Sequence, residues 1–188
     1  MLFRSTGLRE QEVCGLKWDY EVKVPELDTS VFIIPGEHVK NGEERLVVLN
    51  GIAKSVVESV RGLHAVNVFV RAHKKVGESR PVTKMNNTAW KAARERAADA
   101  WEKQHGERAP AGFRHIRVHD LKHTFGRRLR AAGVSFEDRQ DLLGHRSGRI
   151  TTHYSQAELT SLIEAAEKVC ATESRKSPAT TWLRRKTG

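Results

Sequence analysis

The sequence predicts an α+β fold: a mainly α-helical domain with a small antiparallel β-sheet. Two observations support this prediction. Apolar residues recur at helical spacing through most of the second half of the chain, whereas short β-branched runs separated by turn signals lie in the first half. The length of 188 residues, 38% of them hydrophobic, suits one ordinary domain with a tail rather than two large domains.

In the first half, the clearest expected element is a β-hairpin. Residues 31–34 (Val-Phe-Ile-Ile) and 45–49 (Arg-Leu-Val-Val-Leu) are both strand-like apolar runs. Between them, Asn41-Gly42 favours the positive φ angles of a tight turn, so the two runs should pair antiparallel. Further elements expected from periodicity are a short helix over 8–16, strands over 18–22 and 67–70, and a helix over 52–63.

In the second half, residues 118–132 form the most informative predicted helix. At roughly 100° per residue, its apolar side chains fall in one narrow stripe that marks the core face. The stripe consists of Val118, Leu121, Phe125, Leu129 and Ala132, and the adjacent face carries His119, Lys122, His123 and Arg130. Gly133 ends this helix, and Ser135 with Asp138 is typical of the start of the next one. The remaining expected segments are helices over 87–104, 136–143 and 159–169 and a loop over 105–117.

The charge balance points to a polyanionic partner. The chain has 33 Lys+Arg against 23 Asp+Glu, a formal net charge of +10, and basic residues are dense in segments 112–130 and 171–188. A strongly basic domain has the electrostatic footprint of a nucleic-acid binder. We expect residues 1–170 to form the domain and residues 171–188 to form a loosely ordered basic tail.

Several classes of protein do not fit the sequence. The two cysteines cannot make a disulfide framework, and no apolar run approaches the roughly 18–20 residues that a membrane span needs. The N-terminus lacks the apolar stretch of a signal peptide. These observations predict an intracellular protein without a membrane association.

The segment His119-Asp-Leu-Lys-His123 is the first candidate for chemistry. Two histidines at i and i+4, with Asp120 after the first, resemble a zinc-protease pattern, for which His145 or His153 could supply a third ligand. Against zinc, Asp120 is one methylene shorter than the usual general base, and a basic surface suits a divalent cation poorly. In another interpretation, these histidines are merely surface groups of a helix without a chemical role.

The same segment also suits phosphate chemistry. A cationic cluster can bind a phosphodiester and stabilise charge on its non-bridging oxygens. Tyr154, nine residues after His145, offers a hydroxyl nucleophile. Because its free pKa is near 10, a tyrosine attacks well only when proton transfer and positive neighbours assist it. Taken alone, Tyr154 fits a packing aromatic better than a nucleophile.

Three segments together resemble the tyrosine recombinase (phage integrase) family. They are Thr6-Gly-Leu-Arg-Glu-Gln-Glu-Val-Cys-Gly-Leu-Lys-Trp18, His119-Asp-Leu-Lys-His-Thr-Phe125, and Leu143-Gly-His145 with Tyr154. Their order and spacing match over about residues 1–165. The resemblance implies the family's DNA breaking-rejoining fold, a mostly helical catalytic domain with a small antiparallel sheet.

The resemblance also implies a set of residues that act on one scissile phosphate. These are Arg9 and Lys122 to grip it, Lys40 to protonate the leaving 5′-oxygen, His119 to assist proton transfer, His145 to hydrogen-bond a non-bridging oxygen, and Tyr154 to attack phosphorus, with Glu12 and His123 in support. The product would be a 3′-phosphotyrosine and a free 5′-hydroxyl. Because the ester conserves the bond energy and the cations replace a metal, no ATP, metal or other cofactor is expected.

Two departures from the family pattern matter. Lys122 stands where the family usually has a second arginine, so charge is kept but the planar fork that binds two oxygens is lost. The chain also begins only eight residues before Arg9, so we expect an N-terminally truncated catalytic domain that binds DNA weakly. The rival interpretations are a catalytically impaired DNA-binding remnant and a zinc hydrolase built on His119 and His123.

The expected partner is a duplex DNA attachment site. The resemblance implies a site-specific recombinase that works as a homotetramer on two duplexes when full-length, whereas the isolated domain would be monomeric. It further implies a bacterial or phage-encoded protein that acts on DNA in the cytoplasm.

Overall fold

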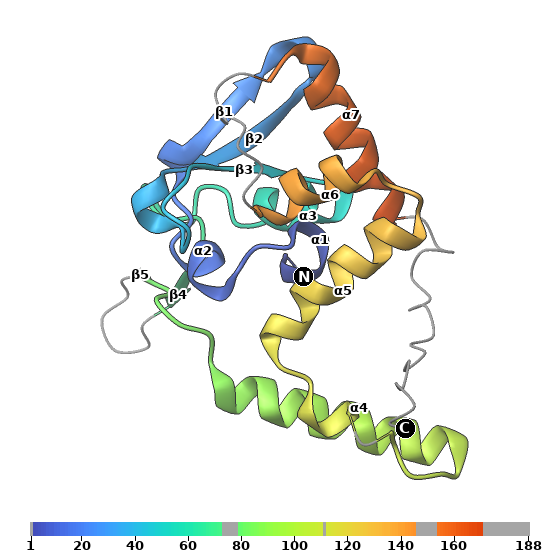
Figure 1. Cartoon of the computed structure of the whole chain (residues 1–188). Helices are drawn as coiled ribbons and strands as arrows, with labels where there is room; N and C mark the ends of the chain where they lie inside the picture. The colour runs from blue at the N-terminus through green and yellow to red at the C-terminus, as the bar shows by residue number, and fades with distance from the viewer. Residues whose placement is uncertain (1, 73–78, 111, 146–153, 171–188) are drawn as a thin grey trace.

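The computed structural model describes residues 2–72, 79–110, 112–145 and 154–170 (Figure 1). Strands lie in the first half and longer helices fill the second half, which confirms the predicted α+β class. The strands are β1 (Glu21–Val24), β2 (Thr29–Ile34), β3 (Arg45–Val48), β4 (Val70–Ala72) and β5 (Ser79–Pro81). The helices are α1 (Phe3–Thr6), α2 (Glu10–Cys14), α3 (Gly51–Glu58), α4 (Asn87–His105), α5 (Val118–Ala131), α6 (Phe136–Leu143) and α7 (Gln156–Glu167).

The predicted β-hairpin is confirmed. Strands β1, β2 and β3 form one antiparallel sheet in that order, and Phe32 pairs with Val47 across β2 and β3. In the connection, the amide of Gly42 donates to the carbonyl of Val39 at 2.9 Å. Gly42 adopts a φ of 76°, which is the left-handed conformation that the turn requires. The turn places Lys40 at the exposed tip of this connection.

The strand predicted over residues 18–22 is wrong in its extent. Residues Trp18–Tyr20 form a 3₁₀ turn, and β1 begins at Glu21. Trp18 is held by another segment: its backbone amide donates to the carbonyl of Val66, and its indole Nε1 donates to the carbonyl of His64, both at 3.0 Å. This contact with a distant loop overrides the local strand pattern.

Two other elements of the first half also differ from their predicted bounds. The helix expected over 52–63 is α3, which ends at Glu58 and leaves Leu63 exposed. In the segment expected as a strand over 67–70, Asn67 makes only an isolated bridge with Lys17, and β4 begins at Val70. Strand β4 pairs with β5 in a separate two-stranded sheet.

The three-stranded sheet separates two apolar clusters. Because alternate residues of a strand point to opposite faces, Phe32 contributes to the first cluster and Val31 to the second. The first cluster collects side chains from α1, α2 and α3, and the second collects them from α5, α6 and α7. In α5, Phe125 and Leu129 are almost fully buried, as the predicted core stripe requires.

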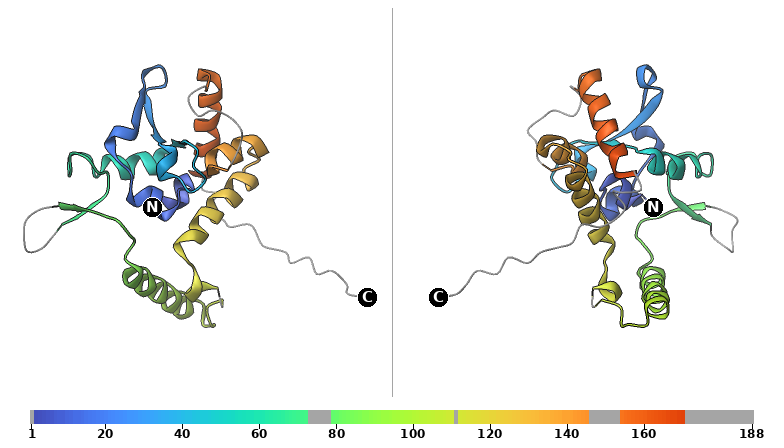
Figure 2. Two further views of the ribbon diagram at one scale, coloured as in Figure 1. Left: turned by 60° about the vertical axis from the view of Figure 1, so that its left-hand side comes forward. Right: turned by 90° about the vertical axis from the view of Figure 1, so that its right-hand side faces the viewer.

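Helix α4 lies apart from the sheet (Figures 1 and 2). It matches the helix predicted over 87–104, and Ala98 is its buried residue. The indole Nε1 of Trp90 donates to the carbonyl of Ile116 at 2.8 Å, and Arg114 forms ion pairs with three acidic side chains of the helix. These contacts attach α4 to the segment that leads into α5.

The C-terminal prediction falls outside the described residues. Residues 171–188, expected to form a basic tail, are not among them. Within the part of the chain that the structure describes, none of the helices is both long and apolar enough to cross a membrane.

Candidate active site

The first candidate residues lie at the start of α2. The backbone amide of Arg9 donates to Glu12 Oε2 at 2.7 Å, and Arg9 Nη1 donates to Glu12 Oε1 at 2.8 Å. Glu12 is 3% exposed, whereas the side chain of Arg9 keeps 25% of its surface exposed. The buried Glu12 therefore holds Arg9 from the protein interior, and the partly exposed side chain of Arg9 remains open to a ligand.

Three of the predicted residues line one hollow of about 510 Å³. Arg9 comes from the start of α2, Lys40 from the β2–β3 connection, and His119 from the first turn of α5. Lys84 adds a further ammonium group to the wall, and Glu10 adds a carboxylate. A cluster in which cations predominate suits a phosphate ligand.

His119 is paired with its neighbour one turn later. The rings of His119 and His123 lie edge to face, with centroids 4.8 Å apart. Partial burial lowers the pKa of His119, and the positive charges of His123 and Lys122 lower it further. A histidine that is neutral at neutral pH can accept a proton, as the role implied by the resemblance requires.

The zinc interpretation needs a third ligand beside this pair. Among residues 2–72, 79–110, 112–145 and 154–170, no three His, Cys, Asp or Glu side chains gather in a way that could hold a metal ion. His153, one of the predicted third ligands, lies outside these ranges. The described residues therefore offer no complete set of zinc ligands.

Lys122 lies deeper than its predicted place on the side of α5. It is 5% exposed, and its Nζ donates to the carbonyl of Leu143 at 2.7 Å, at the end of α6. Burial lowers the pKa of Lys122 to about 7, and the charges of Arg45 and Arg9 act in the same direction. The ammonium is thus close to both arginines, but it already has one hydrogen-bond partner.

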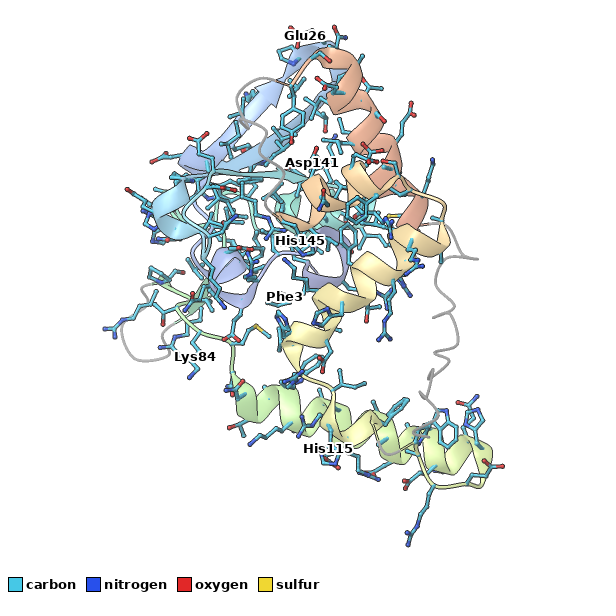
Figure 3. The ribbon with its side chains drawn as sticks, viewed as in Figure 1. Phe3, Glu26, Lys84, His115, Asp141 and His145 are labelled. Atoms are coloured by element: carbon cyan, nitrogen blue, oxygen red, sulfur yellow. The ribbon has the colours of Figure 1, made fainter. Side chains whose placement is uncertain are left out.

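His145 directly follows α6. The helix ends at Gly144, which has a φ of 59°, and Figure 3 shows His145 near the centre of the molecule. Lys122, His123 and His145 line a groove of about 840 Å³ along α5 and α6. Partial burial lowers the pKa of His145, and the charge of Lys122 lowers it further, so the neutral ring can donate one N–H.

Tyr154 is placed differently from the other predicted residues. It is half-buried and packs against the second apolar cluster, just before α7. Helix α7 contacts α6 and β3, and Figure 3 shows His145 near the end of α6. Residues 146–153, which join His145 to Tyr154, are outside the described residues. The residues that line the hollow around Arg9 and the groove along α5 and α6 do not include Tyr154.

Arg45 is a member of this cluster that the sequence analysis missed. It is 2% exposed and forms an ion pair with Glu12, whose other partner is Arg9. Burial lowers the pKa of Arg45 to about 10, and the carboxylate of Glu12 opposes this effect. The available signal was an arginine that opens an apolar strand run.

Comparisons with known proteins agree with the resemblance seen in the sequence. A family model described as "Phage integrase family" matches residues 1–160. The integrase of Salmonella phage P22 is 31% identical over 172 residues, which cover 88% of this chain and 40% of that protein. The tyrosine recombinase XerC of Thermodesulfovibrio yellowstonii is 29% identical over 167 residues, which cover 89% of this chain and 52% of the relative. The chain therefore spans about half the length, or less, of these two relatives.

Among solved structures, a similar chain is the Tn1549 transposon integrase (aa 82–397) in complex with circular intermediate DNA. It is 19% identical, with a TM-score of 0.45, and the match covers 85% of this chain and 54% of that one.

Proposed function

Since the chain belongs to the phage integrase family, we propose that it cuts and rejoins duplex DNA through a covalent bond to Tyr154. The observation that carries this proposal is the gathering of Arg9, Lys40 and His119 around one hollow, with Lys122 and His145 in the adjoining groove. These cations and histidines come from four separate segments. Such an arrangement suits the growing negative charge of a phosphoryl-transfer transition state.

In the proposed reaction, the Tyr154 hydroxyl loses its proton to His119 as its oxygen attacks phosphorus. The bond between phosphorus and the 5′-oxygen breaks, and Lys40 protonates that oxygen. The products are a 3′-phosphotyrosine and a free 5′-hydroxyl, and the reverse attack by a 5′-hydroxyl rejoins the strand. Arg9, Lys122 and His145 hold the non-bridging oxygens, while Glu12 and His123 support them.

The reaction requires Tyr154 to reach the cation cluster. Tyr154 lies nine residues after His145, and nine residues span at most about 30 Å. We infer that DNA binding moves Tyr154 from its place on the second apolar cluster into the hollow beside Arg9.

The proposed substrate is an attachment site in duplex DNA, and four copies of the full-length protein acting on two duplexes form the proposed complete assembly. The net charge of +10 supports a DNA partner. We expect this reaction to take place on DNA in the cytoplasm of a bacterial cell.

A second candidate function is DNA binding without cleavage. Two observations favour it: Tyr154 packs on the second cluster, and Lys122, which stands where the family usually has an arginine, donates to the Leu143 carbonyl. A chain of this kind would bind duplexes but leave both strands intact.

A trapping experiment separates the two functions. The 188-residue chain is incubated with a pool of random-sequence duplexes that carry nicks, so that a short cut strand diffuses away and rejoining is blocked. A DNA adduct that survives denaturation and maps to Tyr154 supports the recombinase. Tyr154→Phe should abolish the adduct, whereas Tyr20→Phe, at the other tyrosine of the chain, should leave it intact. DNA binding without any adduct favours the second candidate.

A further inference from the structure

Arg45 joins three segments that are distant in the sequence. From the first residue of β3, its Nη1 pairs with Glu12 Oε2 of α2. Its Nη2 donates to the carbonyl of Gly7 at 3.0 Å and lies 3.5 Å from the carbonyl of Leu142 in α6. One buried guanidinium therefore contacts the segment that precedes α2, the helix α2 itself, and the end of α6.

We propose that Arg45 is the positioning residue of the site, which holds Arg9 and His145 in place for the same phosphate without touching it. This inference rests on the proposed function. Arg45 is 2% exposed, so its guanidinium is covered by protein on almost every side. Arg45 therefore acts on Arg9 through Glu12 and on His145 through the end of α6.

The link to Arg9 runs through Glu12. Glu12 Oε1 accepts from Arg9 Nη1, and Glu12 Oε2 accepts from both the Arg9 amide and Arg45 Nη1. Because both oxygens are engaged, the plane of the carboxylate is fixed by Arg45 on one side, and the same plane fixes the fork of Arg9. Without Arg45, the buried carboxylate would be held only by the amide and the guanidinium of Arg9, with no contact from the opposite side.

The link to His145 runs through the end of α6. The last carbonyls of a helix lack partners inside the helix and carry the negative end of its dipole. Here Lys122 bonds the carbonyl of Leu143, and Arg45 lies beside that of Leu142. A Cβ on Gly144 would lie 2.6 Å from Arg45 Nε, so the chain just before His145 is in direct contact with the guanidinium.

A purely structural role for this residue is the competing explanation. Burying a cation is unfavourable, and an apolar side chain of similar volume often replaces a buried ion pair without loss of stability. Among the described residues, Arg45 Nε is buried and has no hydrogen-bond partner, which adds to this cost. Stability alone therefore does not explain why this position holds an arginine, whereas a need to orient the Glu12 carboxylate does.

The test compares Arg45→Lys and Arg45→Met with the matched variant Arg61→Lys. Arg61 also bridges two glutamates, Glu21 and Glu58, but on the exposed surface. All variants are assayed well below the unfolding midpoint of the least stable one. We measure the single-turnover rate of adduct formation at saturating nicked duplex, the Kd for the same duplex, and the rate of Glu12→Gln alone and combined with Arg45→Lys.

We expect Arg45→Lys to slow adduct formation by about 10- to 100-fold, as a displaced catalytic group does, with the Kd changed less than about twofold. Because one of the two links of Arg45 runs through Glu12, the double variant should be less impaired than the product of the two single effects predicts. Arg61→Lys should match the parent chain. Additive effects of Arg45→Lys and Glu12→Gln, or an unchanged rate for Arg45→Lys, would overturn the proposal.

A second readout does not depend on DNA cleavage. In protein labelled with ¹⁵N-arginine, the side-chain signal of Arg9 is identified by its loss in Arg9→Lys. A guanidinium held by Glu12 rotates slowly, and we expect Arg45→Lys to release this rotation while Arg61→Lys does not. If the parent chain forms no adduct, the proposed function fails and this measurement alone decides the inference. An Arg9 signal that stays unchanged in Arg45→Lys overturns it.

Discussion

The protonation of Lys122 should control the pH dependence of the reaction. Burial and the charges of Arg45 and Arg9 lower the pKa of Lys122 to about 7, so the free protein loses this charge as the pH rises through neutrality. Because the transition state needs the positive charge, we expect the single-turnover rate at low DNA concentration to fall above about pH 7. Lys122→Arg keeps its charge at every accessible pH, so its rate should stay level there. A pH–rate profile of both forms checks this prediction.

The lowered pKa of Lys122 should also make the free energy of unfolding depend on pH. The pKa of Lys122 is lowered from 10.5, so between pH 7 and 10.5 the unfolded chain binds more protons than the folded chain. The contribution of Lys122 to the free energy of unfolding should therefore increase with pH across that window and be least favourable below it.

Parallel pH–rate profiles for the parent chain and the Lys122→Arg variant would contradict the assignment of the fall in rate above about pH 7 to Lys122.

Lys40 should act as the acid for the leaving 5′-oxygen. It lies at the exposed tip of the β2–β3 connection and lines the hollow that contains Arg9. Lys40→Ala should slow the cutting of ordinary DNA by about 10²–10⁴-fold, the usual value of a positioned proton donor. A 5′-bridging phosphorothiolate leaves without a proton, so the variant should cut it at nearly the parent rate. Lys54→Ala, on α3, is the surface control. Equal defects on both substrates would assign the proton to another group.

Single residues were predictable from the sequence where their roles follow from local pattern. His119 and Lys122 stand one turn apart on α5, so their proximity follows from helical geometry. The depth of Lys122 was not predictable, because it depends on how the end of α6 covers α5. Arg45 was missed for a similar reason: its partner Glu12 lies 33 residues away, and no local pattern records that contact.

At the scale of elements, the end of α6 should be sensitive to one added methyl group. Gly144 and Gly106 both end helices with positive φ, at 59° and 70°. A Cβ at Gly106 meets open space, whereas one at Gly144 would lie 2.6 Å from Arg45 Nε. Gly106→Ala should therefore lose only about 1–2 kcal/mol of stability, the cost of placing a residue with a Cβ in the left-handed conformation. Gly144→Ala should lose more and should also slow adduct formation, because Arg45 must move.

Denaturant unfolding of the two glycine variants measures this difference. An equal loss of stability in both variants would show that the contact between Arg45 and the end of α6 does not constrain the chain.

Elements with strong periodicity were predicted well. The apolar stripe of α5 and the cap of α6, where the amide of Asp138 donates to Ser135 Oγ at 3.0 Å, were both predicted from sequence. The strand predicted over residues 18–22 is shorter because the backbone amide of Trp18 bonds to the carbonyl of Val66, far along the chain. Local pattern specifies hydrophobic faces and caps, whereas the register of short strands depends on partners that the local sequence does not identify.

At the scale of the whole molecule, the candidate site lies where the two faces of the sheet meet. Helix α2 packs with the first cluster, and α5 and α6 pack with the second, so Arg45 on β3 can contact both sides. Candidate cations and histidines that are far apart in the sequence are brought together beside this sheet. Tyr154 belongs to the second side, on the cluster that α7 covers. The proposed reaction requires Tyr154 to approach the phosphate from this side.

The net charge of the whole chain should govern its affinity for DNA. With a net charge of +10, affinity for random-sequence duplex should come mainly from phosphate contacts that release counterions. The logarithm of the association constant should then fall linearly with the logarithm of salt concentration, by about 0.9 per contact. Arg127 is exposed and lines the groove along α5 and α6, so Arg127→Gln should reduce the slope by about one contact. Arg61→Gln should change it less, because Glu21 and Glu58 already pair with that guanidinium. Fluorescence anisotropy with a labelled duplex between low and physiological salt measures these slopes. An affinity that stays constant over that range would contradict this prediction, because it would mean that contacts other than those to phosphates hold the DNA.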